Sequence, residues 1–139
     1  LVVQMVETFG DGMKPAFVEE RESIALARKL NMPLGPVMIF GDDVTHIVTE
    51  EGIANLLLCR SSDDIEQAIR GVAGYTPVGI ARDHAKVAAL RARGIIRRPE
   101  DLGIDPLQAN RNLLAARSIR DLVTWSDGLY APPSKFRNW

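Results

Sequence analysis

The chain of 139 residues has little cysteine, no excess of charge of either sign and no long hydrophobic run. Its one cysteine, Cys59, excludes an internal disulfide and a zinc site built from several thiolates. A net charge of −1 argues against a dedicated nucleic-acid-binding protein, which normally carries a basic excess. No apolar run approaches the ~20 residues that a helix needs to cross a bilayer, so we expect no membrane contact.

Familiar ligand-binding motifs are missing as well. The chain has no Walker A loop, no G-x-G-x-x-G and no H-E-x-x-H, and its two histidines, His46 and His84, lie far apart, so we expect no metal site. Cys59 lies in an apolar run with no cation before Arg60, which indicates an inert packing residue. A single cysteine is compatible with the reducing cytoplasm, where we expect the protein to act.

The composition that remains is that of a folded globular chain, with 46% hydrophobic and 25% charged residues. The chain starts inside an apolar segment of strand length, with neither an initiator methionine nor a signal peptide. We therefore expect it to be a piece of a longer protein.

Strand and helix patterns alternate along the first 75 residues. We expect strands at 1–7, 37–40 and 44–49, and helices at 17–30, 53–58 and 62–70. This alternation predicts an α/β fold with a mainly parallel, open sheet.

Residues 81–139 are expected to form a helical extension with an extended tail. Helices are predicted at 82–93, 106–116 and 119–125. Gly94 marks the end of the first, Asp105 followed by Pro106 starts the second, and Ser118 with Asp121 has the spacing of a capping box. The predicted domains are therefore 1–80 and 81–139.

Residues 45–54 hold the most informative pattern. Strand alternation puts His46 and Glu50 on one face, with Glu50 at the carboxyl end of the strand, where open α/β sheets bind ligands. Gly52 permits a tight turn and close approach of a ligand. A carboxylate there suits attack on an acyl group or acid–base chemistry. The alternative is that Glu50 and Glu51 only begin a helix and stay solvated.

Two weaker patterns leave functional and structural readings open. The amides of residues 9–14, which include Gly10 and Gly12, could face an oxyanion or a phosphate, or form a plain surface turn. Seven arginines of the second half could attract an acidic partner or form a solvated face: Arg91, Arg93, Arg97, Arg98, Arg111, Arg117 and Arg120.

Residues 48–54, V-T-E-E-G-I-A, resemble a motif of the group of acetate CoA-transferases, acetyl-CoA hydrolases and citrate lyase α subunits. The whole chain is more similar still to the C-terminal part of the malonate decarboxylase α subunit. This resemblance rests on residues 7–15, 41–46, 71–79 and 128–139.

The resemblance implies part of a CoA-transferase-type domain and a particular exchange reaction. Such an α subunit exchanges acetyl for malonyl on an acyl carrier protein, so that acetyl-carrier and malonate become malonyl-carrier and acetate. The implied partners are the carrier subunit and the other malonate decarboxylase subunits. The carrier holds its thioester on a phosphopantetheine-type arm derived from dephospho-CoA, and no tightly bound cofactor is implied.

The resemblance also implies site residues. Glu50 matches the motif glutamate, which lies in the active site against the carboxylic-acid substrate, while Gly10 and Gly12 fit a glycine-containing oxyanion loop. Gly52 and His46 are expected to line the pocket, and the alternative for His46 is an ordinary buried histidine. In related enzymes the glutamate that forms the acyl anhydride lies upstream, so which carboxylate carries the acyl group stays open. The alternatives are a CoA transferase or citrate lyase α subunit acting on another carboxylate, and a non-catalytic module that docks a subunit.

Overall fold

The computed structural model describes residues 1–19, 23–33 and 39–137. The chain divides into two compact units, Leu1–Arg98 and Pro99–Trp139. The first contains a sheet with helices, and the second contains helices with an extended tail. The expected mixed α/β fold is confirmed at this level.

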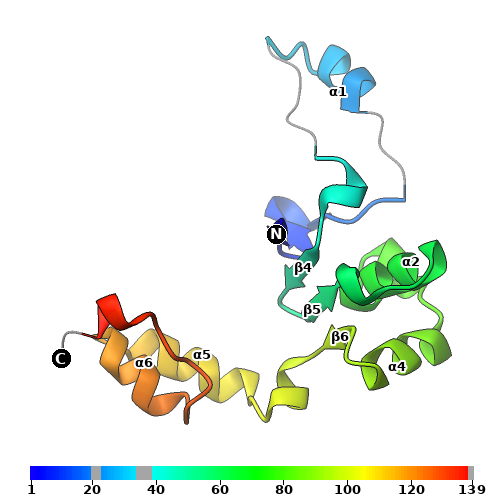
Figure 1. Ribbon diagram of the computed structural model, residues 1–139. Helices are drawn as coiled ribbons and strands as arrows, with labels where there is room; N and C mark the ends of the chain where they lie inside the picture. Colours follow the sequence, from blue (N-terminus) through cyan, green and yellow to red (C-terminus); the bar gives the residue numbers. More distant parts are fainter. Residues whose placement is uncertain (20–22, 34–38, 138–139) are drawn as a thin grey trace. The chain divides into compact units, whose positions relative to one another are not determined.

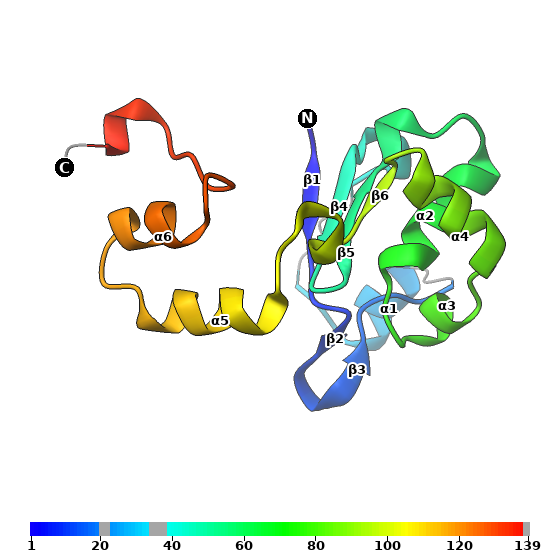
Figure 2. The same ribbon diagram turned by 90° about the horizontal axis from the view of Figure 1, so that it is seen from below.

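The sheet of the first unit is mixed, which corrects the expectation of a mainly parallel sheet. Its strands lie in the order β1 (Val3–Met5), β4 (His46–Thr49), β5 (Gly52–Asn55) and β6 (Ile96–Arg97) (Figures 1 and 2). β1 runs parallel to β4, whereas the β4–β5 and β5–β6 pairs are antiparallel.

A tight hairpin accounts for the difference. Thr49 pairs with Gly52 across residues 50–51, so the chain reverses and forms β5 where a helix was expected over 53–58. Gly52 has φ +151°, and a Cβ there would lie 2.4 Å from the carbonyl oxygen of Arg97. The only helical turn in that stretch is the short 3-10 helix Leu56–Leu58.

Two helices, α2 (Ser62–Val72) and α4 (His84–Ala92), cover one face of the sheet, joined through the short α3 (Pro77–Ile80) (Figures 1 and 2). The buried core combines side chains of the sheet and these helices, namely Ile47, Ala54, Ala68, Val72, Val87, Leu90, Ile95 and Ile96. Cys59 packs against this core, and burial raises the pKa of its thiol, with Asp64 adding to the rise. The expected packing role of Cys59 is thus confirmed.

The boundary between the two units lies at residues 98–99, whereas the sequence placed it at 80–81. The reason is close packing between α2, α4 and β6. A Cβ at Gly71 of α2 would lie 2.6 Å from Ile96 Cδ1 and 3.3 Å from Val87 Cγ1. Helix α4 and strand β6 therefore belong to the first unit.

Shorter elements complete the first unit. Strands β2 (Phe9–Gly10) and β3 (Lys14–Pro15) form a separate antiparallel pair, which projects from the sheet in Figure 2. Helix α1 (Ser23–Lys29) lies within the helix expected over 17–30, of which residues 20–22 fall outside the described part. Of the strand expected at 37–40, residues 37 and 38 fall outside it too, and Ile39 and Phe40 are not in a strand.

The second unit contains α5 (Pro106–Ala115) and α6 (Ile119–Trp125). Asp105 caps α5 by accepting hydrogen bonds from the N–H groups of Leu107 and Gln108, and Ser118 and Asp121 form a capping box on α6. These caps confirm the starts expected from the sequence. Within the described residues 99–137, Pro132 is the only buried residue.

Candidate active site

Thr8 and Glu50 meet at the carboxyl ends of the parallel pair β1–β4. The N–H of Val6 donates to the carbonyl of Val48 at 3.0 Å, so the chain stays beside β4 after β1 has ended. Thr8 follows two residues later, and Glu50 comes directly after β4. Open α/β sheets bind their ligands at this end of parallel strands.

Thr8 donates to the Glu50 carboxylate with both of its donor groups. Its backbone N–H lies 3.0 Å from Oε1 and 3.0 Å from Oε2, and its hydroxyl donates to Oε1. Thr8 is buried, with 3% of its surface exposed, whereas Glu50 is exposed. The carboxylate is therefore held from one side and open to solvent elsewhere.

These hydrogen bonds stabilise the ionised form of Glu50. Burial by itself raises the pKa of the carboxyl, but the Thr8 hydroxyl, the backbone N–H of Glu50 and the backbone N–H of Thr8 outweigh it and lower the pKa below its ordinary value. Glu50 is ionised at neutral pH, which is the form that attacks an acyl group or accepts a proton.

Gly74 supports Thr8 from the other side. Gly74 has φ +62°, and a Cβ there would lie 3.0 Å from Thr8 Cγ2 and 3.1 Å from Thr8 Oγ1. Thr8, Glu50 and Gly74 come from residues 7–15, 48–54 and 71–79, which are among the segments that carry the resemblance. Three segments far apart in the sequence thus meet around one threonine.

His46 lies at the opposite end of β4 from Glu50. Four residues of extended chain separate the two, or about 13 Å. The Nδ1 atom of His46 lies 3.0 Å from the hydroxyl of Thr45, which donates to the carbonyl of Val2 at 2.8 Å. The structure brings Thr8, not His46, to the carboxylate.

The three glycines expected at the site have different surroundings. Gly52 is buried against the backbone of Arg97, which gives its missing side chain a structural reason. Gly10 and Gly12 lie exposed in and after β2, and a Cβ at Gly12, where φ is +67°, would meet no atom within 4 Å. The side-chain position is therefore open at Gly12 and filled by the backbone of Arg97 at Gly52.

Comparison with known proteins decides the family. The family model described as malonate decarboxylase, alpha subunit, transporter matches residues 1–139. The chain belongs to this family. It is also 57% identical over 139 residues to the acetyl-S-ACP:malonate ACP transferase of Malonomonas rubra, covering 100% of this chain and 25% of that protein.

Solved members of the malonate decarboxylase α-subunit family share the fold. A malonate decarboxylase α subunit from Acinetobacter baumannii aligns with a TM-score of 0.73 and 53% identity, over 96% of this chain and 25% of that one. A Pseudomonas malonate decarboxylase hetero-tetramer in complex with malonate aligns with a TM-score of 0.71 and 55% identity, over 100% of this chain and 25% of the matched one. The chain thus spans about a quarter of the length of the relatives it matches.

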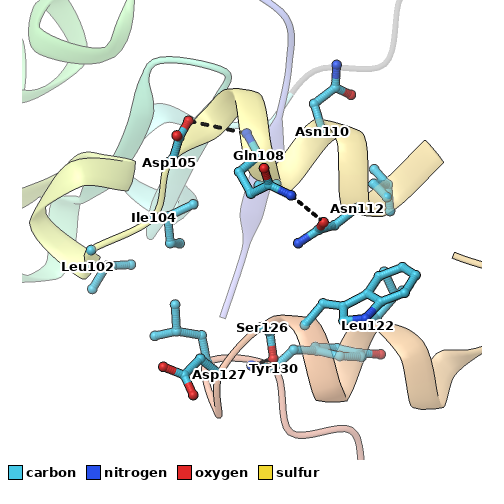
Figure 3. Close-up of a pocket in the computed structure, with 15 residues that line it drawn as sticks. Leu102, Ile104, Asp105, Gln108, Asn110, Asn112, Leu122, Ser126, Asp127 and Tyr130 are labelled. Atoms are coloured by element: carbon cyan, nitrogen blue, oxygen red, sulfur yellow. Dashed lines mark hydrogen bonds between the residues drawn. The ribbon is translucent and has the colours of Figure 1, made fainter. Parts of the chain in front are cut away.

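The second unit of this family member holds a cleft of about 990 Å³ between α5, α6 and the segment that follows α6 (Figure 3). Some polar side chains that line it are engaged in hydrogen bonds at the N-cap of α5 or within α5. Asp105 accepts from the backbone N–H of Gln108 at 3.2 Å, and the Gln108 amide donates to Asn112 Oδ1 at 2.8 Å. Leu122 and Tyr130 line the cleft from the other side.

The described residues also bear on three other features, namely a metal site, a membrane span and a basic face. Within residues 1–19, 23–33 and 39–137, no three His, Cys, Asp or Glu side chains gather as a metal site would require. No helix in the described part of the chain is long and apolar enough to cross a membrane. Of the expected basic face, Arg93 pairs with Asp64 at 3.0 Å.

Thr8 is the residue of this site that the sequence did not single out. It stands in the segment E-T-F-G-D-G, where the glycines attracted attention. Its contact with Glu50 spans 42 positions of the chain, and no local spacing encodes such a pairing.

Proposed function

We propose that this chain is part of a transferase that exchanges acetyl for malonyl on an acyl carrier protein. Acetyl-carrier thioester and malonate would give malonyl-carrier thioester and acetate. The support is 57% identity, over the whole of this chain, to a relative named acetyl-S-ACP:malonate ACP transferase. In the structure, the ionised Glu50 carboxylate, held by Thr8 at the carboxyl ends of β1 and β4, carries the proposal.

The chemistry requires an enzyme carboxylate. That carboxylate attacks the acetyl thioester, displaces the carrier thiolate and forms an acetyl-glutamyl anhydride. The thiolate attacks the glutamyl carbonyl, releasing acetate and leaving an enzyme thioester. Malonate then attacks this thioester and frees the thiolate, which takes the malonyl group from the mixed anhydride and regenerates the carboxylate.

Glu50 is a proposed catalytic residue in this sequence of steps, either as that carboxylate or as a group against the incoming acid. Every step develops a tetrahedral oxyanion, and one backbone donor directed at it contributes about 2.7–4 kcal/mol. The amides around Gly10 and Gly12 are proposed for this task because open space surrounds Gly12. His46 and Gly52 remain proposed pocket residues.

The wider setting is also proposed. The substrate thioester would be carried on the dephospho-CoA-derived arm of the carrier protein, and other malonate decarboxylase subunits would be partners. A solved relative that forms part of a hetero-tetramer supports the partners. The parallel β1–β4 pair would belong to a CoA-transferase-type domain, and the cytoplasm is the proposed location.

The test is thioester exchange in the full-length protein assembled with its partners. Glu50→Gln and Glu50→Ala should lower the transfer of labelled malonate onto the carrier by at least about 100-fold, which is the range of positioned acid–base or nucleophilic groups. Glu51→Gln is the matched control, because Glu51 adjoins Glu50 in the same hairpin turn. It should keep activity close to the wild type.

Hydroxylamine trapping of the enzyme thioester then separates the two roles of Glu50. If the trapped group is found on Glu50, then Glu50 is the nucleophile. If it is found on another glutamate, then Glu50 is the residue that lies against the incoming carboxylic acid. Full activity in both Glu50 variants, with the protein folded and assembled, would contradict the proposed catalytic role.

A further inference from the structure

Thr8 is buried while its partner Glu50 is exposed, and both donors of Thr8 serve the same carboxylate. One donor is a backbone N–H, whose position is fixed by the chain, and the other is the hydroxyl of the same residue. Two donors from one residue restrict rotation of the Glu50 side chain more than one donor would. Hydrogen bonds to an ionised group are also stronger than those between neutral groups.

Thr8 is itself fixed by its surroundings. Its carbonyl accepts a hydrogen bond from the N–H of Ala16 at 2.9 Å. Its side chain lies against Gly74, where a Cβ would approach Thr8 Cγ2 to 3.0 Å. The threonine therefore has little freedom to move away from Glu50.

The turn that carries Gly74 is itself held by several hydrogen bonds. The guanidinium of Arg82 donates to the carbonyls of Gly74 and Gly79. The hydroxyl of Thr76 donates to the carbonyl of Ala73 at 2.7 Å and accepts from the N–H of Gly79 at 3.2 Å. A rigid turn thus stands behind Thr8.

We infer that Thr8, seated against Gly74, is a positioning residue that fixes the direction of the Glu50 carboxylate for acyl transfer. This inference rests on the proposed function, because it assigns a task to Thr8 only if Glu50 takes part in the reaction. A carboxylate has about four acceptor sites, so bonds from Thr8 on one side leave acceptors free on the open side. Substrate meets a carboxylate whose orientation is already set.

The test compares two variants in the assembled full-length protein. Thr8→Val keeps the shape of the side chain and removes the hydroxyl, whereas Thr8→Ser keeps the hydroxyl. Thr8→Val should lower kcat by about tenfold or more, since small displacements of reacting groups are costly, with a smaller change in KM for malonate. Thr8→Ser should recover most of kcat.

The pH profile gives a readout that a merely structural role would not move. Loss of the hydroxyl bond removes one stabiliser of the ionised carboxylate, so the acid limb of kcat should shift to higher pH in Thr8→Val and return in Thr8→Ser. Thr45→Val is the matched control, because the Thr45 hydroxyl also links β4 to the chain of β1, through Val2, at the opposite end of the pair. In Thr45→Val, the acid limb of kcat should lie at the same pH as in the wild type.

Three results separate this inference from the proposed function. An unchanged kcat and acid limb in Thr8→Val, alongside loss of activity in Glu50→Gln, would overturn the role of Thr8 and leave the proposed function standing. Full activity in Glu50→Gln would overturn both. Should Thr8→Val not assemble, Gly74→Ala displaces Thr8 without altering it, and an acid limb that stays in place there would overturn the inference as well.

Discussion

At the scale of single residues, the ionised form of Glu50 is stabilised by a threonine 42 positions away in the chain. Because hydrogen bonding lowers the pKa of Glu50 in the folded protein, its ionised form stabilises the Thr8 contact above the pKa of the unfolded chain. This contribution disappears as the pH falls through the folded pKa. We expect the Thr8 amide to lose hydrogen-exchange protection as the pH is lowered from 7 towards 3, measured in the full-length protein relative to the intrinsic exchange rate.

Glu50→Gln provides the control for this pH dependence. Glutamine has no charge to lose, and its amide oxygen still accepts from the Thr8 N–H, so protection should be weaker than in the wild type at pH 7 and nearly constant with pH. A wild-type protection factor that stays flat over the same range would contradict the role of the ionised carboxylate.

At the scale of elements, two adjacent serines at the start of α2 have different roles. Ser61 is the N-cap, and its hydroxyl accepts from the N–H of Asp64 at 3.1 Å, whereas Ser62 occupies the first helical position. We expect Ser61→Ala to lower the free energy of unfolding by about 1 kcal/mol, the usual loss for such a cap, as measured by urea denaturation.

Ser62→Ala is the matched comparison for Ser61→Ala. It places a good helix former inside the helix and should leave the free energy of unfolding nearly unchanged. Equal losses in the two variants would show that the hydroxyl of Ser61 does not cap α2.

Helix boundaries were predictable where the signal is local. Asp105 before Pro106, the Ser118–Asp121 pair and Gly94, which has φ +74°, each mark an end through contacts within a few residues. The β4–β5 hairpin was not predictable in this way. An apolar run of strand length has the same pattern as a buried helical turn, and residues 50–51 lack the Asn-Gly or Asp-Gly signal of a tight hairpin.

The candidate site shows the same division between local and distant signals. The carboxylate at the end of β4 was predictable, because strand alternation and the family motif both pointed to Glu50. Its donor, Thr8, and the Gly74 turn behind it depend on packing between segments that only the fold brings together. Likewise, the close approach of the Arg97 backbone to Gly52 joins segments that only the fold brings together.

At the scale of the whole molecule, the two units differ in how much they bury. The first has a core of eight buried hydrophobic residues, whereas in the described part of the second only Pro132 is buried. Large apolar side chains of the second unit are exposed, including Leu107, Leu114 and Leu129. A chain that buries so little apolar surface has no source for the several kcal/mol that hold a domain together.

We therefore expect a peptide of residues 99–139 to be largely unfolded by itself. Its helices α5 and α6 have 10 and 7 residues, below the ~12–15 residues at which isolated helices become marginally stable in water. Circular dichroism should show little helix and no cooperative melting, whereas residues 1–98 should melt cooperatively. In the full-length protein, the same amides should exchange more slowly than in the peptide, because the relatives are about four times as long and have further surface to cover these helices. A sharp thermal transition of the peptide would mean instead that its exposed leucines collapse on one another and form a core of their own.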